Sequence, residues 1–524
     1  MKHSSNTPLK TCLVALAAVA CFAIFTVAAV AQDDDPPSQA GRLAIVNGNV
    51  SIQPAGSQDW GQAYLNYPLG PGDRIYTDAD GRAEIQVGRT YVRVGPNSDV
   101  TFIDFNSQAV TFGAAQGALH VRTRGLWEGQ SLYVQTPSGT STVTGPADFR
   151  VDLYPDQQTA IFTNYQGDLY LSGANDFGMD TQPGQALELV GTNPVYPQWL
   201  QPAGPDDLDN WSERRDAQIA RATSYQYVSP DAPGAEDLDA YGQWSPGTEY
   251  GDMWFPNVQA GWEPYHNGRW VDHQPWGWVW VEDEPWGYAP FHYGRWASYH
   301  GRWGWIPGPR QDHAVWSPAL VAFAGGDSFG GGGMSIWFPL GPGEPYRPWY
   351  PCTPQYVDRV NISNIRETNV VHVQKTYVNV VNVTNVTNIT YVNRTAATAV
   401  RQQDFASGRP VAQSAVRVDP QMMARARVIA KPEVAPTRGA IINRPPTRPV
   451  PVAVTRPTLI NARGMAVAAQ PKARPAPPPQ KAAPAPPRIP NRVAIAPPPN
   501  VKMTPTARQA MQTAPHAAEA PARS

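Results

Sequence analysis

The sequence predicts a mainly β protein that ends in a long disordered tail. Glycine (44) and proline (56) make up 19% of the 524 residues, whereas an average soluble chain has roughly 12%. Short runs of alternating apolar and polar residues recur between turn residues, at a spacing of about ten residues. Twelve of the 18 tryptophans lie between Trp244 and Trp316. Together these observations indicate an all-β domain, a small Trp-rich β-hairpin module and a Pro-rich tail.

The N-terminus has the pattern of a secretory signal peptide, residues 1–31. Lys2 and Lys10 precede an apolar run at 12–31 that ends in Ala-Val-Ala, and acidic residues follow it. This order predicts export and cleavage after Ala31. An uncleaved helix that anchors the chain to the inner membrane is the alternative, and the sequence before Cys21 is a poor lipoprotein box. We expect a periplasmic or secreted protein whose mature chain does not span a membrane.

The cysteines restrict how the mature chain is stabilised. Two of the three lie in the predicted signal, so only Cys352 remains after cleavage. An internal disulfide and a cysteine-based zinc site are therefore excluded for the mature chain. We expect Cys352 to be a free thiol, with pairing between two molecules as the alternative.

The segment 41–192 is predicted to be an all-β domain. Strand runs such as 91–94 and 149–153 alternate apolar and polar residues, and glycine, proline, asparagine or aspartate separate the runs. Asn47-Gly48 stands between two such runs and predicts a hairpin. The pattern favours a β-sandwich or a solenoid-like roll.

Several short sequences in this domain carry a family resemblance. They are GDRIYT at 72–77, GRAEI at 81–85, VRV at 92–94, VQTP at 134–137 and FRV at 149–151. They resemble the periplasmic FecR domain, which in iron-uptake regulators relays signals between an outer-membrane receptor and a sigma factor. Those regulators carry a cytoplasmic helical anti-sigma segment, whereas only 11 residues precede the apolar run here. A segment that short cannot bury a core, so we expect the domain without the anti-sigma function.

Residues 193–243 are predicted to be a connector. Prolines at 194, 197, 202 and 205 argue against regular structure at its start. Asp206 and Asp207 then offer a helix N-cap, and Leu208, Trp211 and Ile219 recur at helical spacing. The sequence predicts one short amphipathic helix, at about 206–221.

Residues 244–350 form a Trp-rich module with an internal repeat. PYHNGRW at 264–270 matches PFHYGRW at 290–296, and WGW at 276–278 recurs at 303–305. A period of this length predicts two copies of one β-hairpin unit. The alternation of Trp276, Trp278 and Trp280 places their side chains on one face of a strand.

The aromatic and arginine side chains of this module are the candidate binding surface. Its members are Trp276, Trp278, Trp280, Trp303, Trp305, Arg269 and Arg295. Exposed aromatic rows bind sugar faces or cations, whereas buried ones would form the core of a domain with few aliphatic residues. We favour the core, and expect Arg269 and Arg295 to stack on aromatic neighbours. Histidines are frequent here, but no spacing matches a metal-ligand motif, so we predict no metal and no cofactor.

Three stretches of the module carry a second resemblance. GWEPYHNGRW at 261–270, PWGWVWVEDEPWGYAPFHYGRW at 275–296 and GRWGWIPGP at 301–309 resemble an uncharacterised bacterial Trp-rich domain. That domain follows a FecR-like domain in secreted proteins of unknown function. The resemblance implies the same domain order and no known activity.

The rest of the chain is predicted to be extended or disordered. Residues 351–395 are rich in asparagine and valine, with an Asn-Val-Thr repeat of period three, which suits a solenoid rung or a loose extended chain. Residues 396–524 form a basic Pro/Ala-rich tail with a single aromatic residue, Phe405. Residues 401–524 carry a net charge of +15, whereas residues 1–400 carry −17. We expect the tail to be a solvated spacer, with attraction to envelope polyanions as the alternative.

The sequence contains none of the common catalytic motifs, so we predict that the protein is not an enzyme. The leading interpretation is a non-catalytic, exported cell-envelope protein that binds or scaffolds through β surfaces. Its expected partners are envelope polymers or envelope proteins, and not nucleic acid. The alternatives are a FecR-type signal-relay protein without the anti-sigma segment, and a polysaccharide-binding protein that uses exposed tryptophans.

Overall fold

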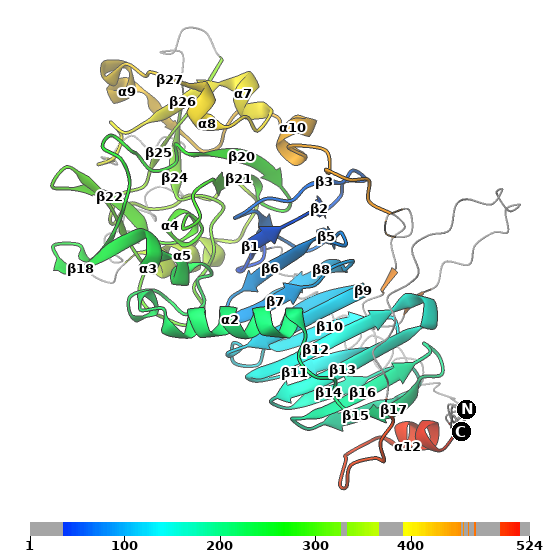
Figure 1. Ribbon diagram of the computed structural model, residues 1–524. Coiled ribbons are helices and arrows are strands. Elements are labelled where there is room, and N and C mark those ends of the chain that lie inside the picture. The colour runs from blue at the N-terminus through cyan, green and yellow to red at the C-terminus, as the bar shows by residue number, and fades with distance from the viewer. Residues whose placement is uncertain are drawn as a thin grey trace, which may run out of the picture.

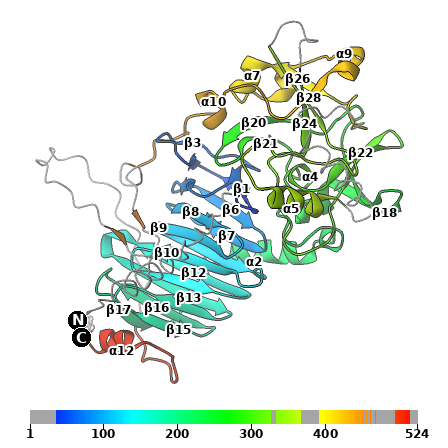
Figure 2. The ribbon, with the colours of Figure 1, turned by 180° about the vertical axis from the view of Figure 1, so that it is seen from behind.

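The computed structural model describes residues 35–325, 333–365, 391–451, 454, 459–460, 466–467 and 493–513. The described part is mainly β, as expected. The predicted signal peptide and the Asn-Val-Thr repeat lie outside it. Two bodies stand side by side: a ladder of strands made by residues 41–200 and an aromatic-rich body made by residues 235–441 (Figures 1 and 2).

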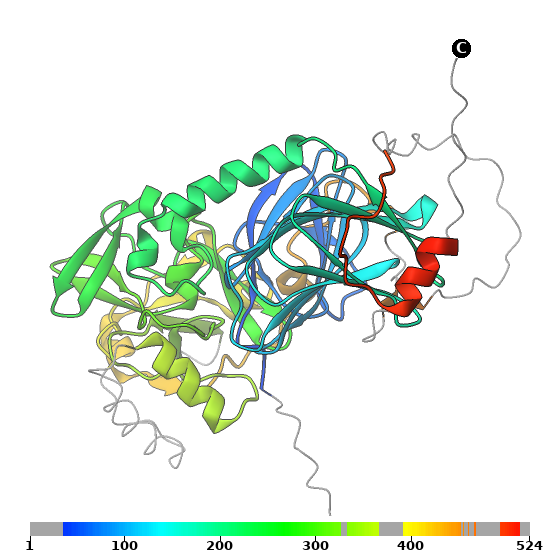
Figure 3. The ribbon, with the colours of Figure 1, turned by 90° about the horizontal axis from the view of Figure 1, so that it is seen from below.

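The first body is a sandwich of two sheets that share one long strand. The first sheet has the order β4 (Pro68–Leu69), β1 (Gly41–Asn47), β6 (Arg82–Val87), β7 (Thr90–Val94), β9 (Ala109–Thr123), β12 (Ala147–Tyr154), β13 (Thr159–Gln166), β16 (Gln185–Val190), β17 (Tyr196–Leu200). The second has the order β3 (Gly61–Gln62), β2 (Val50–Gln53), β5 (Arg74–Thr77), β8 (Asp99–Phe105), β9, β10 (Ser131–Thr136), β11 (Gly139–Val143), β14 (Leu169–Ser172), β15 (Gly178–Thr181). Figure 3 shows the two sheets face to face. The pairings are antiparallel except for that of β9 with β10.

Strand β9 belongs to both sheets because it bends in the middle. Its first part pairs with β8 and β10, and the part from Gly117 onward pairs with β7 and β12. Gly117 has φ +90°, and a Cβ there would lie 2.1 Å from Ser98 Oγ. Only glycine meets both constraints without strain. The apolar residues that the alternation places inward, such as Phe102, Phe112 and Val121, are fully buried between the sheets.

The expected hairpin at Asn47-Gly48 does not form. Strand β1 pairs with β4 and β6 in the first sheet, whereas β2 pairs with β3 and β5 in the second. The dipeptide therefore turns the chain from one sheet to the other. Its tight geometry is the one that the sequence indicates, with φ +66° at Gly48, but local turn chemistry does not determine which sheet the next strand joins.

The predicted helix is α2 (Asp207–Arg221), which lies across the first sheet (Figure 1). The side chain of Asp206 accepts hydrogen bonds from the backbone N–H groups of Leu208 and Asp209, and the Asp209 side chain completes the capping box. Leu208, Trp211 and Ile219 are buried, as the spacing predicts. Among the helices in the described ranges, none is both long and apolar enough to cross a membrane.

Buried ion pairs fix α2 to the sheet. Glu84 on β6 is fully buried, and its carboxylate contacts Arg93 of β7 at 3.1 Å and Arg215 of α2 at 2.7 Å. Arg93 also contacts Asp216 of α2 at 2.7 Å. Burial opposes the charged carboxylate, but the two guanidinium groups outweigh it and leave the pKa of Glu84 below its usual value.

The second body contains the repeat as two hairpins, as predicted. In one, β20 (Gly268–His273) pairs with β21 (Gly277–Glu282) and Trp270 lies opposite Trp280. In the other, β22 (Arg295–Tyr299) pairs with β23 (Arg302–Ile306) and Trp296 lies opposite Trp305. The second hairpin continues into a four-stranded sheet with β19 (Gly251–Pro256) and β18 (Gly242–Thr248). The short helix α4 (Ala289–His292) connects the two hairpins, and α3 (Leu238–Tyr241) directly precedes β18.

Part of the segment expected to be extended at 351–395 is helical instead. Helix α5 (Pro354–Asn364) begins after Thr353, whose side chain accepts a hydrogen bond from the N–H of Tyr356. Tyr356, Val357 and Val360 are buried on one side of it. A proline in the first turn and this apolar spacing are helix signals. The prediction of an extended segment rested on the asparagine and valine content instead. Cys352, just before the helix, is half-buried and free, and burial raises the pKa of its thiol to about 11.

The structure also differs from the expected disordered tail over residues 396–451. Strand β26 (Thr398–Arg401) adds to the pair β24 (Val321–Gly325) and β25 (Met334–Pro339), and β27 (Ala415–Val416) and β28 (Arg427–Ile429) extend that sheet on its two sides. Four short helices follow the same course: α7 (Gln402–Ala406), α8 (Val411–Ser414), α9 (Pro420–Arg425) and α10 (Arg438–Ile441). β29 (Leu459–Ile460) and β30 (Ala466–Val467) form a separate pair.

Phe405 explains why this part of the tail is ordered. Its ring lies 4.5 Å from that of Trp278, 5.5 Å from Trp270 and 5.9 Å from Trp337, measured between centroids. The aromatic body thus supplies the apolar surface that the tail lacks by itself. Composition alone cannot reveal such a partner because it lies elsewhere in the chain.

The two bodies meet through buried polar contacts. Arg42 of β1 pairs with Asp237 at 2.7 Å. The Asn66 amide donates hydrogen bonds to the backbone oxygens of Glu282 and Glu284, and His273 Nε2 lies 2.7 Å from the Asp73 carboxylate. The bodies therefore form one continuous structure with a polar seam.

The network around Glu84 predicts a large effect of Arg93→Ala. The substitution removes a fully buried cation from two carboxylates, so we expect it to lower the free energy of unfolding by about 3–5 kcal/mol. Arg122→Ala is the matched control, because the Arg122 side chain pairs with Asp148 and Asp216 but is 32% exposed, and it should cost about 1 kcal/mol or less. Equal losses in urea titrations of the two variants would contradict this interpretation.

The position of Phe405 predicts that the tail stabilises the aromatic body. Replacing Phe405 with alanine opens a cavity among tryptophan rings, so we expect a loss of about 3–5 kcal/mol. Val392→Ala, at a position 63% exposed, should change the stability by less than about 0.5 kcal/mol. Thermal unfolding followed by tryptophan fluorescence measures both; an unchanged midpoint for Phe405→Ala would show that the tail is not docked.

The His273–Asp73 contact predicts a pH-dependent contribution to stability. Burial opposes the charged imidazole, but the Asp73 carboxylate outweighs it and raises the pKa of His273 above 6.5. The contribution is therefore complete below about pH 6.5 and is lost as the pH rises through the raised value. We expect the stability difference between the native chain and His273→Gln to shrink from pH 6 to pH 9 in urea titrations. A stability difference that grows with pH would contradict the sign of this argument.

Candidate functional site

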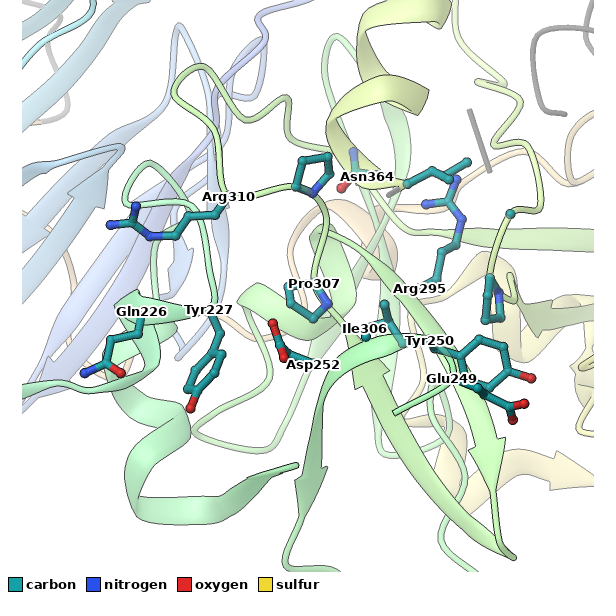
Figure 4. A pocket seen from close by; sticks show the side chains of 15 residues that line it. Gln226, Tyr227, Glu249, Tyr250, Asp252, Arg295, Ile306, Pro307, Arg310 and Asn364 are labelled. Atoms are coloured by element: carbon teal, nitrogen blue, oxygen red, sulfur yellow. The ribbon is translucent and has the colours of Figure 1, made fainter. Parts of the chain in front are cut away.

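A pocket of about 750 Å³ opens on the aromatic body (Figure 4). The β18–β19 hairpin lines one side, and the loop that follows β23 lines another. The C-terminal residues of α5 and the loop at 342–343 complete the wall. The volume lies within the roughly 300–1,000 Å³ range typical of ligand sites.

Tyrosine and proline rings form much of the lining. Tyr227 and Tyr250 are half-buried, and Pro307, Pro309 and Pro342 line the pocket with them. The Tyr227 ring stacks on Trp244 with 4.4 Å between centroids. Trp244 in turn donates a hydrogen bond from Nε1 to Ser224 Oγ at 2.8 Å. Tyr227 therefore has a fixed orientation, and Trp244 covers one face of its ring.

Charges of both signs stand at the mouth. Glu249 is exposed and Asp252 is half-buried, both on the hairpin side. Arg310 is exposed on the loop at the opposite side in Figure 4, and its Nε donates a hydrogen bond to the backbone oxygen of Tyr225 at 2.9 Å. An occupant with apolar faces and both kinds of charge would complement this lining.

Arg295 provides a buried cation at the back of the pocket. Its guanidinium group donates hydrogen bonds to the backbone oxygens of Glu344 and Gly294 and to Asn361 Oδ1. Burial lowers its pKa to about 10, and the nearby Glu344 carboxylate opposes this shift. The group is thus still charged at neutral pH, and protein oxygens surround it.

Asn364 is fixed in the same way. Its side-chain oxygen accepts a hydrogen bond from the N–H of Gly294, and its Nδ2 donates to the backbone oxygens of Val315 and Val360. The polar groups at the back of the pocket therefore hold α5 and the second hairpin together. They give the pocket a rigid wall.

Most of the predicted binding surface lies in the core. Trp276, Trp280 and Trp305 are fully buried, Trp278 is 5% exposed and Trp303 is half-buried. Trp276 packs on Trp316 and His273, whereas Trp280 packs on Trp270 and Trp337. The rings do not form an exposed row, because the second body has few aliphatic residues and uses indoles to fill its interior. This arrangement agrees with the interpretation of these rings as a core.

The two predicted arginines have separate roles. Arg269 lies over the ring of Tyr64 at 5.4 Å and pairs with Asp283 at 3.0 Å. It stacks on an aromatic neighbour, as expected, and its contact joins the two bodies. Arg295 was expected to stack as well, but it is held by hydrogen bonds to oxygens and is the predicted residue that lines the pocket.

The remaining pocket residues were missed from the sequence. Tyr227 lies in the predicted connector at 193–243, and Glu249 and Tyr250 occupy a turn with no motif. Pro309 lies about 80 residues after Tyr227 in the sequence. The Pro-Gly-Pro sequence at 307–309 indicates irregular backbone, but nothing in it identifies the segment that it faces.

The histidines of the module are mostly structural. His292 Nδ1 lies 2.8 Å from the backbone oxygen of Ser317, and burial lowers the pKa of His292 to about 3. Its repeat equivalent, His266, is half-buried, and burial lowers its pKa as well. Within the described residues, no group of three or more histidine, cysteine, aspartate or glutamate side chains could hold a metal ion.

Comparisons with known proteins relate one part of the chain to a family. Residues 235–344 match a family of unknown function (DUF6600). Two crystal structures of a candidate anti-sigma factor from Parabacteroides distasonis ATCC 8503 are similar at low identity, each with a TM-score of 0.22. One is 15% identical over 27% of this chain and 64% of that chain, and the other is 12% identical over 45% and 99%. No curated protein matches. The match therefore covers part of the aromatic body, and the pocket residues Gln226, Tyr227, Asn364 and Ile365 lie outside it.

Proposed function

We propose that this protein is a non-catalytic binding or scaffold protein of the cell envelope, and that the pocket beside the Trp-rich module is its recognition site. The observation that carries the proposal is the division of roles within the pocket. Tyrosine and proline rings and charges of both signs line it, whereas the polar groups of Arg295 and Asn364 are already committed to hydrogen bonds within the protein.

This division favours binding over chemistry. A catalytic group needs a free lone pair or proton directed at the substrate. The donors of Arg295 and the amide of Asn364 instead serve backbone groups, so their contribution is to hold the wall in place. Ring faces and rim charges are the groups that recognise extended ligands by contact.

The envelope location rests on the sequence. The signal-like pattern at 1–31 favours export, and an exported chain meets envelope polymers and envelope proteins. Both have the mixture of apolar and charged groups that the rim would complement. Retention on isolated envelopes is therefore the appropriate first measurement.

Co-sedimentation with cell envelopes of the producing organism tests the proposal. We expect the native chain to pellet with envelopes, and Tyr250→Ala combined with Glu249→Lys to reduce the bound fraction. Truncating a recognition side chain typically costs about 1 kcal/mol or more of binding free energy. This corresponds to an affinity that is roughly fivefold weaker or more. Tyr133→Ala, at a half-buried tyrosine of the sandwich, is the matched control.

Three outcomes would count against this function. They are equal recovery of the native chain from buffer and from envelopes, equal loss in the control variant, and turnover of an envelope component by the purified protein. Parallel pellets of wall sacculi and of membrane vesicles would show which fraction holds the ligand.

A further inference from the structure

The last described segment of the chain covers the end of the sandwich that lies away from the aromatic body. Residues 493–504 run along that end, and α12 (Pro505–Thr513) packs against β15 and β17 (Figures 1 and 3). Both edge strands at this end would otherwise present unpaired backbone groups, which readily pair with another chain.

The contact with β17 is a short antiparallel pairing. Ala494 lies opposite Leu200. The N–H of Gln201 donates to the oxygen of Val493 at 2.9 Å, and the N–H of Ile495 donates to the oxygen of Trp199 at 3.0 Å. Strand β17 itself lies in the stretch where prolines were expected to prevent regular structure. Pro197 fits there because an edge strand tolerates a missing N–H group.

The contact with β15 repeats this pattern in the second sheet. Met503 lies opposite Met179. The N–H of Asp180 donates to the oxygen of Lys502 at 3.0 Å, and the N–H of Thr504 donates to the oxygen of Gly178 at 2.9 Å. Ala507 of α12 is fully buried behind this pairing. One segment thus pairs with the edge strand of each sheet through a single antiparallel bridge.

We propose that this segment is exchanged between two copies of the chain, so that residues 493–513 of each copy cover the β15 and β17 edges of the other. The contacts depend on the segment and the edges, and not on the connection between them. Residues 468–492 separate the segment from the described part before it, and a stretch of that length can span up to about 80 Å. The segment 493–513 can therefore reach the β15 and β17 edges of a second copy.

Exposed apolar side chains at this end favour a second copy as the occupant. Val493 is 51% exposed, Ile495 is 43% exposed and Tyr170 of β14 is 40% exposed. These are three of the large apolar residues exposed in the described part of the chain. Reciprocal exchange brings two such ends together and gives these side chains a surface to pack on. It also closes the assembly at two subunits, because each edge is occupied once.

Light scattering of the full chain over a concentration series tests the exchange. We expect a dimer. We expect Ile495→Pro to weaken the dimer affinity tenfold or more, because proline lacks the N–H group that donates a hydrogen bond to the backbone oxygen of Trp199. Ala494→Pro is the matched control: the hydrogen bonds flank Ala494, so its own N–H points away from β17 and the variant should form the dimer as the native chain does. A synthetic peptide of residues 493–513 should compete and release monomers.

The outcomes separate exchange from its alternatives. A native chain that is monomeric at every concentration overturns the proposal, as does a dimer that neither the peptide nor Ile495→Pro weakens. Stronger association of Ile495→Pro would also overturn it, because that result means direct pairing of bare edges. Near-ultraviolet circular dichroism verifies that both proline variants are folded. The pocket is distant from this end, so envelope binding by Tyr250 and Glu249 variants is scored independently.

Discussion

The structure depends on a buried carboxylate, Glu84, that two guanidinium groups hold in place. Arg93 comes from the sheet and Arg215 from α2, so the ion pairs decide where the helix lies. Because α2 is the connection between the two bodies, its position determines where the chain re-enters to build the aromatic body. After α2, a second ion pair, between Arg42 and Asp237, joins the first sheet to the aromatic body. A charge buried at this depth is tolerated only with its partners in place, which makes the arrangement specific.

The aromatic body uses a different principle. Its interior is filled by indole rings that meet at tilted and edge-on angles, and the tail closes it through Phe405. Large rings cover much area with few residues, which suits hairpins rich in glycine and proline. The consequence for function is that tryptophan, the most conspicuous residue type, provides rigidity, while tyrosine and proline face the pocket. Recognition and support are therefore assigned to different aromatic residues.

Local patterns explain what could be predicted from the sequence. Period-two alternation, the Asp206 cap and the 26-residue repeat each depend on neighbours in the chain, and the strands, α2 and the two hairpins follow from them. Long-range choices could not be predicted. The turn at Asn47-Gly48 joins two sheets, and Phe405 is ordered by tryptophans more than 50 residues away. The pocket could not be predicted for the same reason. Of its lining residues, only Arg295 was a candidate from the sequence. Residues such as Tyr227 and Pro309 are far apart in the chain and come to line one pocket only after folding.

The bend of β9 at Gly117 has a mechanical consequence. One continuous strand contributes hydrogen bonds to both layers, its first part to one and the part from Gly117 onward to the other, so the layers cannot move apart without distorting the backbone between the two parts. Layers joined only by loops could open one after the other, as subglobal units of unequal stability. Here the shared strand couples them, and amide-exchange protection is expected to be uniform across both halves of the sandwich. This coupling is expected to slow proteolysis, because proteases act on the partially open forms that it suppresses.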